Sequence, residues 1–329
     1  MKVNLFIRKP FRLGNFSLEI FYKELVNELK NDIEINLVQL PFHNRGIIQR
    51  FLNIIFCYFK QSQVNHIVGD ITYCSLLMTK NKLVTTIHDC GAIFMSKGIK
   101  KKLLKYFLFS MPAKRSKRII CISNSTKSDL ISFNIDIADK YEIIPNTVSN
   151  SFFLNKKTKN SNKKSKFLVI GTAPNKNIER IAIALENFDA DLTIIGKLNV
   201  SQKNQLNLSK INFEEIDYPL SEEQVIDQYL KSDILLFPST FEGFGMPIIE
   251  ANLLGVCVIT SNISSMPYVA NNAAHLVDPY DTKSISNGIK KVLNDNDYMM
   301  QLIENGYINA KRFDIKNIAK KHIELYNKL

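Results

Sequence analysis

Short runs of apolar, β-branched residues alternate along this chain with segments whose apolar residues recur three and four positions apart. The short runs are typical of buried strands, and the longer spacing is typical of amphipathic helices. In the first half the predicted strands are 3–7, 35–40, 66–68, 83–87, 118–122 and 142–144. The predicted helices between them are 17–30, 47–60, 99–111 and 125–133. This alternation predicts a parallel sheet covered on both faces.

The same alternation starts again after a polar interruption. Residues 155–166 contain six lysines and no apolar residue, which indicates a solvated linker. Beyond it the predicted strands are 167–170, 192–195, 211–216, 234–237, 256–259 and 274–277. Predicted helices include 177–186, 222–231 and 246–254, and the chain ends in helices from Asp281 onward.

The predicted fold class is therefore α/β, with two Rossmann-like, doubly wound domains of similar size. We expect residues 1–154 to form the first domain, residues 155–166 the lysine-rich linker and residues 167–329 the second domain. We allow for the last helix packing back on the first domain. Ligands of such sheets bind beyond the carboxyl ends of the strands, so two domains of this kind would face each other across a ligand-binding cleft.

The charge of the chain favours an anionic partner. Its 329 residues carry 43 Lys and Arg against 31 Asp and Glu, a formal net charge of +12. Candidate partners are nucleic acid, a phospholipid surface or a phosphorylated small molecule. No recognisable nucleic-acid-binding module occurs in the sequence, so we expect no nucleic acid among the partners.

The cysteines and histidines predict neither a metal site nor a disulfide framework. The five cysteines form no Cys-x-x-Cys pair, and the five histidines are scattered. Unpaired thiols are typical of a reducing compartment. The apolar run at the N-terminus is too short for a signal peptide, and residues 47–59 fall short of the ~20 needed to span a bilayer. We therefore expect a cytoplasmic protein.

The most informative stretch is DILLFPSTFEGFGMPIIEANLLG at residues 233–255. A strand is predicted to end at Pro238, and a helix is predicted to begin near Met246, with Glu242 and two glycines in the loop between them. Glycines let a ligand approach the backbone, and N–H groups at a helix start favour an anion. Glu242 and Glu250, with seven residues between them, either bind separate hydroxyl groups of one ligand or are merely solvated. The spacing alone leaves both interpretations open.

Two common nucleotide-binding motifs are missing from the chain. The Gly-x-Gly of this loop is not completed by a third glycine, because residue 248 is Ile, and no Gly-Lys-Ser/Thr loop is present. Dinucleotide-binding and P-loop chemistry are therefore disfavoured.

The 233–255 stretch resembles the signature of the retaining glycosyltransferases of family 4, the group 1 glycosyltransferases, which have the GT-B fold. Other motifs follow in the family's order: TIHD at 86–89, ISNSTKSDL at 122–130, IPNTV at 144–148, GTAPNKNIER at 171–180 and SNISSMPYVA at 261–270. The resemblance covers nearly the whole chain.

This resemblance implies a metal-independent, hexosyl-type glycosyltransferase that needs no cofactor besides its donor. The donor would be a nucleoside diphosphate sugar, with UDP or GDP as the nucleotide, and the sugar would be transferred with retention of configuration. The acceptor would be a saccharide or a lipid-linked saccharide. The implied setting is the synthesis of bacterial surface polysaccharide or lipopolysaccharide.

The resemblance also implies a role for each matching residue. The expected catalytic residues are His88, which would lie over the donor sugar, and Glu242, which would hold one of its hydroxyls. Glu250 would accept hydrogen bonds from the ribose. The expected phosphate-binding groups are Lys176, the backbone around Phe244, Gly245 and Met246, and the loop of Gly14. A lysine and helix-start amides stabilise a leaving diphosphate electrostatically and replace a metal ion.

One departure from the family concerns the phosphates. The family usually has an arginine close to the phosphate-binding lysine, but the corresponding positions here are Thr172 and Asn175. The bidentate clamp that arginine provides is therefore absent at its usual place. Asn175 and Lys197, which follows the next predicted strand, are weaker candidates for phosphate contacts.

A basic segment at residues 90–128 contains ten cationic residues and no acidic one. Its apolar helical stripe, which we expect to pack on the sheet, comprises Ile99, Leu103, Leu104, Phe107, Leu108 and Met111. The lysines then form either an ordinary solvated face or a surface that docks on anionic lipid at the inner face of the membrane. A peripheral location there is thus an open alternative to a purely cytoplasmic one.

Two further functions are compatible with the same motifs. A phosphorylase or epimerase of GT-B fold would use the same phosphate loop for a different reaction. A catalytically degenerate, membrane-docked binding protein would explain the missing arginine. The presence of Glu242, Glu250, Lys176 and His88 argues against degeneration.

Overall fold

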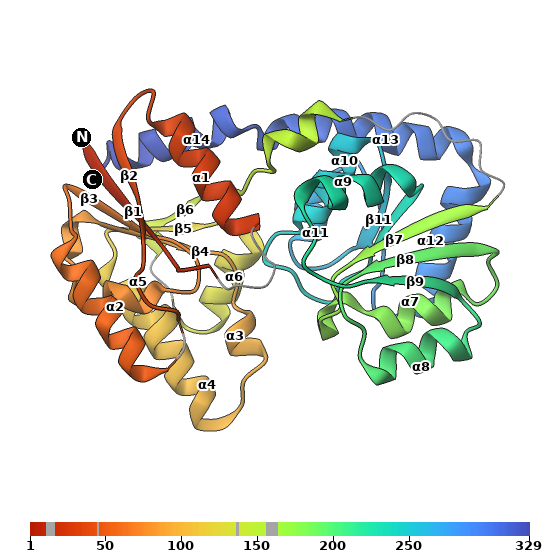
Figure 1. Cartoon of the computed structure of the whole chain (residues 1–329), viewed down its shortest axis with the longest axis horizontal. Coiled ribbons are helices and arrows are strands. Elements are labelled where there is room, and N and C mark those ends of the chain that lie inside the picture. The colour runs from red at the N-terminus through yellow and green to blue at the C-terminus, as the bar shows by residue number, and fades with distance from the viewer. Residues whose placement is uncertain (11–16, 45, 136–137, 156–163) are drawn as a thin grey trace. The chain divides into compact units, whose positions relative to one another are not determined.

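A computed structural model describes residues 1–10, 17–44, 46–135, 138–155 and 164–329 (Figure 1). The chain divides into two compact units. Unit 1 comprises residues 1–147 and 314–329, and unit 2 comprises residues 148–313. Gly14 and most of the predicted linker lie outside the described residues.

Unit 1 contains a six-stranded sheet in which every paired neighbour is parallel, in the order β2-β1-β3-β4-β5-β6. The strands are β1 (Lys2–Ile7), β2 (Glu34–Gln39), β3 (Val64–Ile67), β4 (Leu83–Ile87), β5 (Arg118–Cys121) and β6 (Tyr141–Ile143). The helices are α1 (Ser17–Leu29), α2 (Ile47–Phe59), α3 (Gly91–Phe94), α4 (Gly98–Lys105), α5 (Met111–Arg115), α6 (Asn124–Ser132) and α14 (Ile315–Tyr326). Short helical turns occupy Thr72–Leu77, Lys80–Lys82, Tyr106–Ser110 and Ala138–Lys140.

Both faces of the unit 1 sheet are buried. Leu5 of β1 belongs to the core formed with α1 and α14, and its neighbour Phe6 belongs to the core formed with α2. This alternation follows from the pleat, which points successive side chains to opposite faces. The strand is therefore apolar throughout, as the sequence predicts for a doubly covered parallel sheet.

Unit 2 repeats the plan with a second parallel sheet, in the order β12-β11-β10-β7-β8-β9. Its strands are β7 (Ser165–Ile170), β8 (Ala190–Ile195), β9 (Asn212–Ile216), β10 (Ile234–Phe237), β11 (Cys257–Ser261) and β12 (His275–Val277). Its helices are α7 (Ile178–Leu185), α8 (Val200–Leu208), α9 (Glu222–Lys231), α10 (Met246–Leu254), α11 (Met266–Ala270), α12 (Thr282–Asn294) and α13 (Asn296–Ala310). Short turns lie at Asn150–Leu154, Pro174–Lys176 and Lys311–Phe313. All twelve predicted strands are present, which confirms the predicted α/β class.

Unit 2 begins at Val148, earlier than the expected end of the first domain at residue 154, and the last helix belongs to unit 1, as the sequence analysis allowed. The chain enters unit 2 at Val148, before the linker, because Phe152 is buried and its ring lies 6.2 Å from that of Tyr229. At the other end α14 belongs to unit 1, where its Ile318 joins the core and the helix contacts α1. The apolar face of α14 therefore completes a sheet that residues 1–147 leave partly uncovered.

The predicted packing of the 99–111 stripe is wrong for half of its residues. Ile99, Leu103 and Phe107 are exposed, Leu104 and Leu108 are half-buried, and Met111 is buried. The predicted single helix is interrupted by a π-helical turn at Tyr106–Ser110. A π turn contains an extra residue and so rotates the following side chains to another face. Ile99 and Leu103 of α4 are left in solvent beside its lysines.

No helix in the described ranges is long and apolar enough to cross a membrane. The five cysteines are all free and buried.

Candidate functional site

The loops after β7 and β10 lie next to each other because the two strands are neighbours in the unit 2 sheet. Phe167 and Leu168 of β7 pair in parallel with Ile234 and Leu235 of β10. From this pair β8 and β9 continue on one side, and β11 and β12 continue on the other. The strand order thus reverses between β7 and β10, which is where open α/β sheets bind ligands.

Residues 171–176 form a turn that is tied to the loop after β10. The backbone N–H of Thr240 donates to the carbonyl of Asn175 at 2.9 Å, and the Asn175 side chain donates to the carbonyl of Phe241 at 2.8 Å. Gly171 has φ +88°, and a Cβ there would lie 3.0 Å from Cε of Lys176. The glycine therefore gives the Lys176 side chain room to fold back over the turn.

A buried asparagine that the sequence analysis did not single out ties the turn after β7 to the loops after β10 and β12. Asn177 has φ 66°, a left-handed conformation that asparagine tolerates better than most residues. Its side-chain amide donates to the carbonyls of Pro238 at 3.0 Å and Pro279 at 2.7 Å. The GTAPNKNIER motif contains Asn177, but the sequence of the motif does not show that this side chain is buried.

Lys176 and Glu242 form an ion pair at the centre of these loops. Lys176 Nζ lies 2.6 Å from Glu242 Oε1, and the two side chains are only 17% and 15% exposed. The Asn175 amide donates to the same oxygen at 3.2 Å, and Lys176 Nζ stands 4.5 Å from the ring centroid of Phe237. The structure thus brings three predicted site residues together. Glu242 Oε2 accepts no hydrogen bond from the described residues.

Two serines, also missed by the sequence analysis, hold the backbone around Glu242. Ser265 Oγ lies 2.9 Å from the carbonyl oxygen of Glu242 and 2.7 Å from that of Phe244, so its single proton is shared between two acceptors. Ser264 Oγ donates to the Glu242 carbonyl at 2.8 Å. Both serines belong to the SNISSMPYVA motif, so the motif indicated the segment but not the contact.

The start of α10 offers backbone donors beside this pair. Gly245 precedes the helix with φ 106°, which favours glycine, and Phe244 and Gly245 are buried. In the described part of the chain the N–H groups of Phe244, Gly245 and Met246 donate to no protein acceptor. A helix start of this kind binds anions through its N–H groups and its dipole.

Glu250 lies in the second turn of α10 and is held by a tyrosine that the sequence analysis missed. Tyr229 Oη, fully buried, donates to Glu250 Oε2 at 2.6 Å. Burial raises the pKa of the Glu250 carboxyl to about 7, although the bond from Tyr229 acts against this shift. The charge of Glu222 raises this pKa, and that of Lys176 lowers it. Lys176 therefore acts on both glutamates.

Lys197 is not brought to the Lys176–Glu242 pair. Its side chain is exposed, and its charge contributes to lowering the pKa of Glu215, for which Lys203 is the largest cause. Thr172 uses its hydroxyl to donate to the Lys197 carbonyl at 2.7 Å. Neither residue stands in for the missing arginine in this structure.

His88 follows β4 in unit 1. Its Nε2 lies 3.1 Å from the hydroxyl of Tyr22, and its carbonyl accepts a hydrogen bond from Thr126 at 3.3 Å. Burial, aided by the charge of Arg8, lowers the pKa of His88 to about 3. The imidazole is therefore neutral at physiological pH.

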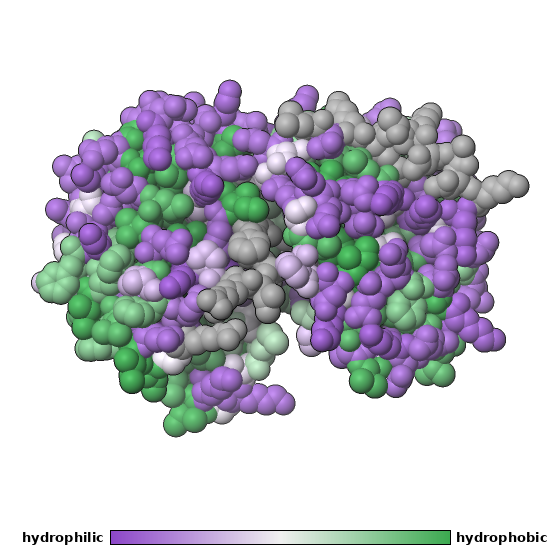
Figure 2. All heavy atoms as spheres, in the orientation of Figure 1, coloured by the Kyte–Doolittle hydropathy of each residue, from purple (hydrophilic) through white to green (hydrophobic). Residues whose placement is uncertain are grey.

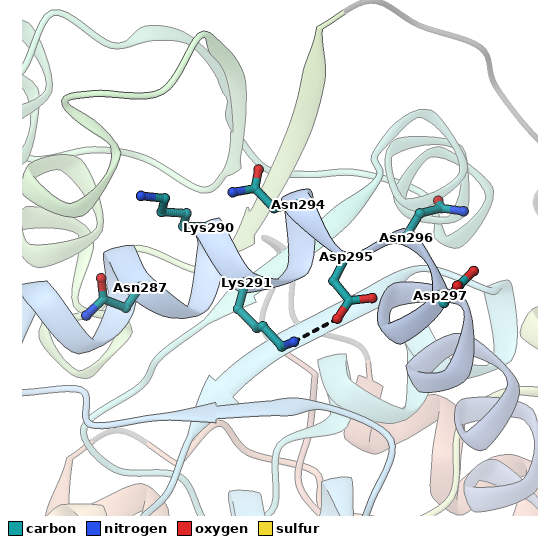
Figure 3. Close-up of a pocket in the computed structure, with 7 residues that line it drawn as sticks. All are labelled: Asn287, Lys290, Lys291, Asn294, Asp295, Asn296 and Asp297. Carbon is teal, nitrogen blue, oxygen red and sulfur yellow. Dashed lines mark hydrogen bonds and ion pairs between the residues drawn. The ribbon is translucent and has the colours of Figure 1, made fainter.

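A metal centre and a surface hollow are weaker candidates for the site. Within the described ranges no group of three or more His, Cys, Asp or Glu side chains is placed to hold a metal ion. An open hollow of about 620 Å³ lies where α12 meets α13 (Figure 3). It shares no residue with the loops after β7 and β10, and its lining side chains do not converge on one point. We therefore assign the candidate site to the loops.

Comparison with known proteins matches two consecutive segments of the chain to glycosyltransferase families. Residues 151–309 match the family described as Glycosyl transferases group 1, and residues 59–152 match the one described as Glycosyltransferase Family 4. The O-antigen chain mannosyltransferase RfbU of Salmonella typhimurium is 27% identical over 257 residues. That match covers 76% of this chain and 70% of the relative.

Solved structures share the fold. Sucrose-phosphate synthase from Thermosynechococcus elongatus superposes with a TM-score of 0.81 at 16% identity, covering 99% of this chain and 98% of that one. Anabaena Alr3699/HepE, in complex with UDP and glucose, gives a TM-score of 0.76 at 14% identity, with both chains fully covered. These likenesses confirm the predicted GT-B fold.

The half-buried Lys176–Glu242 pair predicts a measurable coupling in the unliganded protein. Lys176→Met leaves a poorly hydrated carboxylate without its cation, and we expect a loss of about 1–3 kcal/mol in the free energy of unfolding. Adding Glu242→Gln should recover part of that loss, so that the double-mutant cycle gives a coupling of about 1 kcal/mol or more. Urea denaturation of the four proteins measures it.

The matched control is the exposed pair of Lys291 and Asp295, whose charged atoms are 2.7 Å apart. Exposed pairs couple by about 0.3–0.5 kcal/mol. A Lys176–Glu242 coupling no larger than that of the control would contradict the interpretation.

Proposed function

We propose that this chain, which belongs to the group 1 glycosyltransferases, transfers a hexosyl group with retention from a nucleoside diphosphate sugar to a saccharide or lipid-linked saccharide acceptor. The observation that carries the proposal is the convergence of Lys176, Glu242 and the free N–H groups at the start of α10. Together they provide a cation, a carboxylate and an anion-binding backbone at one switch point.

The nucleotide part of the donor would bind to α10. One oxygen of Glu250 is held by Tyr229, and no described residue donates to the other oxygen, which is therefore placed to accept from ribose hydroxyls. The diphosphate would lie against the N–H groups of Phe244, Gly245 and Met246. Lys176 keeps further N–H donors beyond its bond to Glu242.

The chemistry requires stabilisation of the leaving group. When the glycosyl–phosphate bond breaks, positive charge develops at the anomeric carbon and negative charge develops on the diphosphate. Lys176 and the α10 N–H groups would stabilise the diphosphate by fixed electrostatics, the role that a metal ion has in other transferases. Glu242 Oε2 would accept a sugar hydroxyl, and His88 would contact the sugar. We assign no protein nucleophile.

The relatives support the proposed biological setting. RfbU is named a mannosyltransferase of the O-antigen chain, which favours mannose as the transferred sugar and bacterial surface polysaccharide as the product. The HepE complex contains UDP and glucose, which keeps UDP beside GDP as a candidate nucleotide. A phosphorylase, an epimerase and an inactive binder would each give a different result in a binding and turnover experiment.

We expect one nucleotide sugar from a panel of UDP-, GDP-, ADP- and TDP-sugars to stabilise the protein against thermal unfolding. A ligand that binds only the folded state contributes about 2.7 kcal/mol at a hundredfold excess over its Kd. With an oligosaccharide acceptor, proton NMR should show a product whose anomeric configuration equals that of the donor. Binding without turnover would favour the degenerate binder. Release of a sugar phosphate would favour a phosphorylase, and formation of an epimer would favour an epimerase.

We also expect the affinity for the donor to depend on pH. Glu250 binds ribose as a carboxylate, so a donor that binds below its pKa of about 7 must first displace a proton. Affinity should therefore reach a plateau above pH 8 and fall roughly tenfold by pH 6. The Glu250→Gln variant should bind the donor more weakly but should not show this fall in affinity between pH 8 and pH 6. A pH dependence caused by the nucleotide's own phosphates would persist in the variant.

We further propose that unit 1 docks on an anionic membrane surface, which would place the enzyme in the cytoplasm at the inner face of the membrane. Three apolar side chains of α2, Ile47, Ile48 and Phe59, are 88%, 76% and 77% exposed. Figure 2 shows apolar residues gathered over the region where Figure 1 places α2 and α4. α4 adds the lysines 100–102 and 105 to the surface. Apolar side chains beside cationic ones are typical of interfacial helices.

The docking proposal predicts that the protein sediments with vesicles containing anionic lipid and not with neutral ones. Salt should release it, because exposed charges are screened. Replacing lysines 100–102 by Gln, or Ile47 and Ile48 by Ser, should each weaken binding several-fold. Leu208→Ser, at an exposed apolar position of unit 2, is the matched control and should bind normally. Equal binding to both vesicle types, or to neither, would contradict the proposal.

A further inference from the structure

The turn that ends unit 2 packs against the loop before α10. Phe313, in the turn Lys311–Phe313, is 1% exposed, and its ring centroid lies 5.5 Å from that of Phe244, with the two ring planes at 85°. Edge-to-face pairs of this kind are favourable beyond the area that they bury. The side chain of Phe244 is therefore anchored on a residue from the far end of unit 2.

Phe244 is held at two points. Phe313 contacts its ring, and Ser265 Oγ lies 2.7 Å from its carbonyl oxygen. The peptide that contains this carbonyl also contains the Gly245 N–H, which bonds no acceptor in the described part of the chain. Gly245 has φ 106° and no side chain that could fix its own position. The direction of its N–H therefore depends on how firmly Phe244 is held.

The Phe313 ring is in turn covered by Arg312. The guanidinium carbon of Arg312 stands 5.1 Å from the ring centroid of Phe313 and 5.0 Å from that of Tyr268 on α11. Arg312 Nη1 also donates to Oδ1 of Asn309 at 2.7 Å. Stacking and hydrogen bonding together fix this side chain, although the residue is exposed to solvent.

Asn309 ties this end of α13 to both α10 and α11. The residue is 2% exposed, and its amide donates to Oδ1 of Asn252 on α10 at 2.9 Å and to the carbonyl of Val269 on α11 at 2.8 Å. Gly306 lets the helices approach this closely, because a Cβ there would lie 3.0 Å from Nδ2 of Asn252. The helix that follows the loop is thus held from the same side as Phe244.

We call Asn309, Arg312 and Phe313 the buttress. We propose that the buttress holds Phe244 in place and so directs the N–H groups at the start of α10 toward the distal phosphate of a nucleoside diphosphate. This inference rests on the proposed function, which puts the diphosphate against these N–H groups. The buttress acts through Phe244, and its members are positioning residues.

The contribution of the buttress falls on one part of the nucleotide. An N–H···O hydrogen bond weakens steeply as its angle departs from linearity, so a loosened Phe244 lowers the affinity for the phosphate that these N–H groups bind. Glu250 is held separately, by Tyr229 Oη at 2.6 Å, and keeps its contact with the ribose. A contact that served only stability would not distinguish between these two parts of the ligand.

Titration calorimetry with UDP, GDP and the corresponding monophosphates tests this without turnover. Phe313→Leu keeps an apolar side chain but removes the ring. We expect diphosphate binding to weaken about tenfold, as for the loss of one hydrogen bond to a charged group, and monophosphate affinity to stay within about twofold. An equal loss for diphosphate and monophosphate, or no loss for either, would overturn the proposal.

Tyr298→Leu is the matched control. Tyr298 lies on α13, the helix before the buttress turn, and its ring meets that of His275 edge-on at 5.8 Å. This variant also loses an edge-to-face pair of unit 2 and should bind all four nucleotides as the native protein does.

A double-mutant cycle shows whether Phe313 acts through Phe244. Phe244→Leu alone should weaken diphosphate binding to a similar extent, and Phe313→Leu should add less than about twofold in that background, because the ring contact is already lost. Additive losses would overturn the route through Phe244. If Phe313→Leu folds poorly, Arg312→Gln replaces an exposed residue and leaves the core intact. It should lower diphosphate affinity about two- to threefold at unchanged monophosphate affinity, and the absence of this selective loss would overturn the proposal.

The amide of Gly245 reports anion binding at the atom concerned. Phe244 and Gly245 form the only Phe-Gly pair in the sequence, so protein labelled with ¹³C-carbonyl phenylalanine and ¹⁵N-glycine gives a single signal in a carbonyl-edited NMR spectrum. Inorganic pyrophosphate should shift this signal in the native protein, and half-saturation should need about tenfold more pyrophosphate in Phe313→Leu. A native signal that responds neither to pyrophosphate nor to UDP or GDP would overturn the proposed phosphate site and the buttress with it. Equal affinity in both proteins would overturn the buttress alone.

Discussion

The ion pair of Lys176 and Glu242 is the constraint on which the site in unit 2 depends. Two charges that are mostly removed from water are tolerable only when each has a partner and further hydrogen bonds. The neighbouring strands β7 and β10 bring the two loops together, Gly171 makes room for the lysine, and Asn175 donates to the carboxylate. The pair is thereby held beside the free N–H groups of α10 before any ligand binds.

The same principle recurs at the other two proposed ligand-binding side chains. Glu250 is oriented by Tyr229, and His88 is oriented by Tyr22. In each case a buried hydroxyl occupies one atom of the charged or polar group and leaves another atom for the ligand. Tyrosine suits this role because its ring fills the core while its hydroxyl needs a partner.

Apolar periodicity predicted all twelve strands. The signal is clearest for central strands such as β4 and β10, because strands buried on both faces are continuous runs of apolar residues. It failed at the π turn of Tyr106–Ser110, where an extra residue rotates the helix face. The family resemblance also predicted that Asn175, Lys176 and Glu242 belong to one site. It did not reveal Tyr229, Asn177 or Ser265, because buried contacts between distant segments leave no local pattern. The place of Lys197 after a strand suggested a phosphate contact, but its side chain is exposed and interacts with Glu215.

Our central proposal is that two glutamates bind different parts of the nucleotide sugar. Glu242, in the loop after β10, binds the sugar, and Glu250, on α10, binds the ribose. Steady-state kinetics of Glu242→Ala and Glu250→Ala, with inhibition by the free nucleotide, test it most directly. A hydrogen bond to a charged group contributes about 1.5–3 kcal/mol, roughly 10- to 150-fold. Glu250→Ala should raise the donor KM and the nucleotide inhibition constant together, because the ribose contact changes little during transfer. Glu242→Ala should lower kcat and leave nucleotide affinity nearly intact. Equal loss of nucleotide affinity in both variants, or none in Glu250→Ala, would contradict the account.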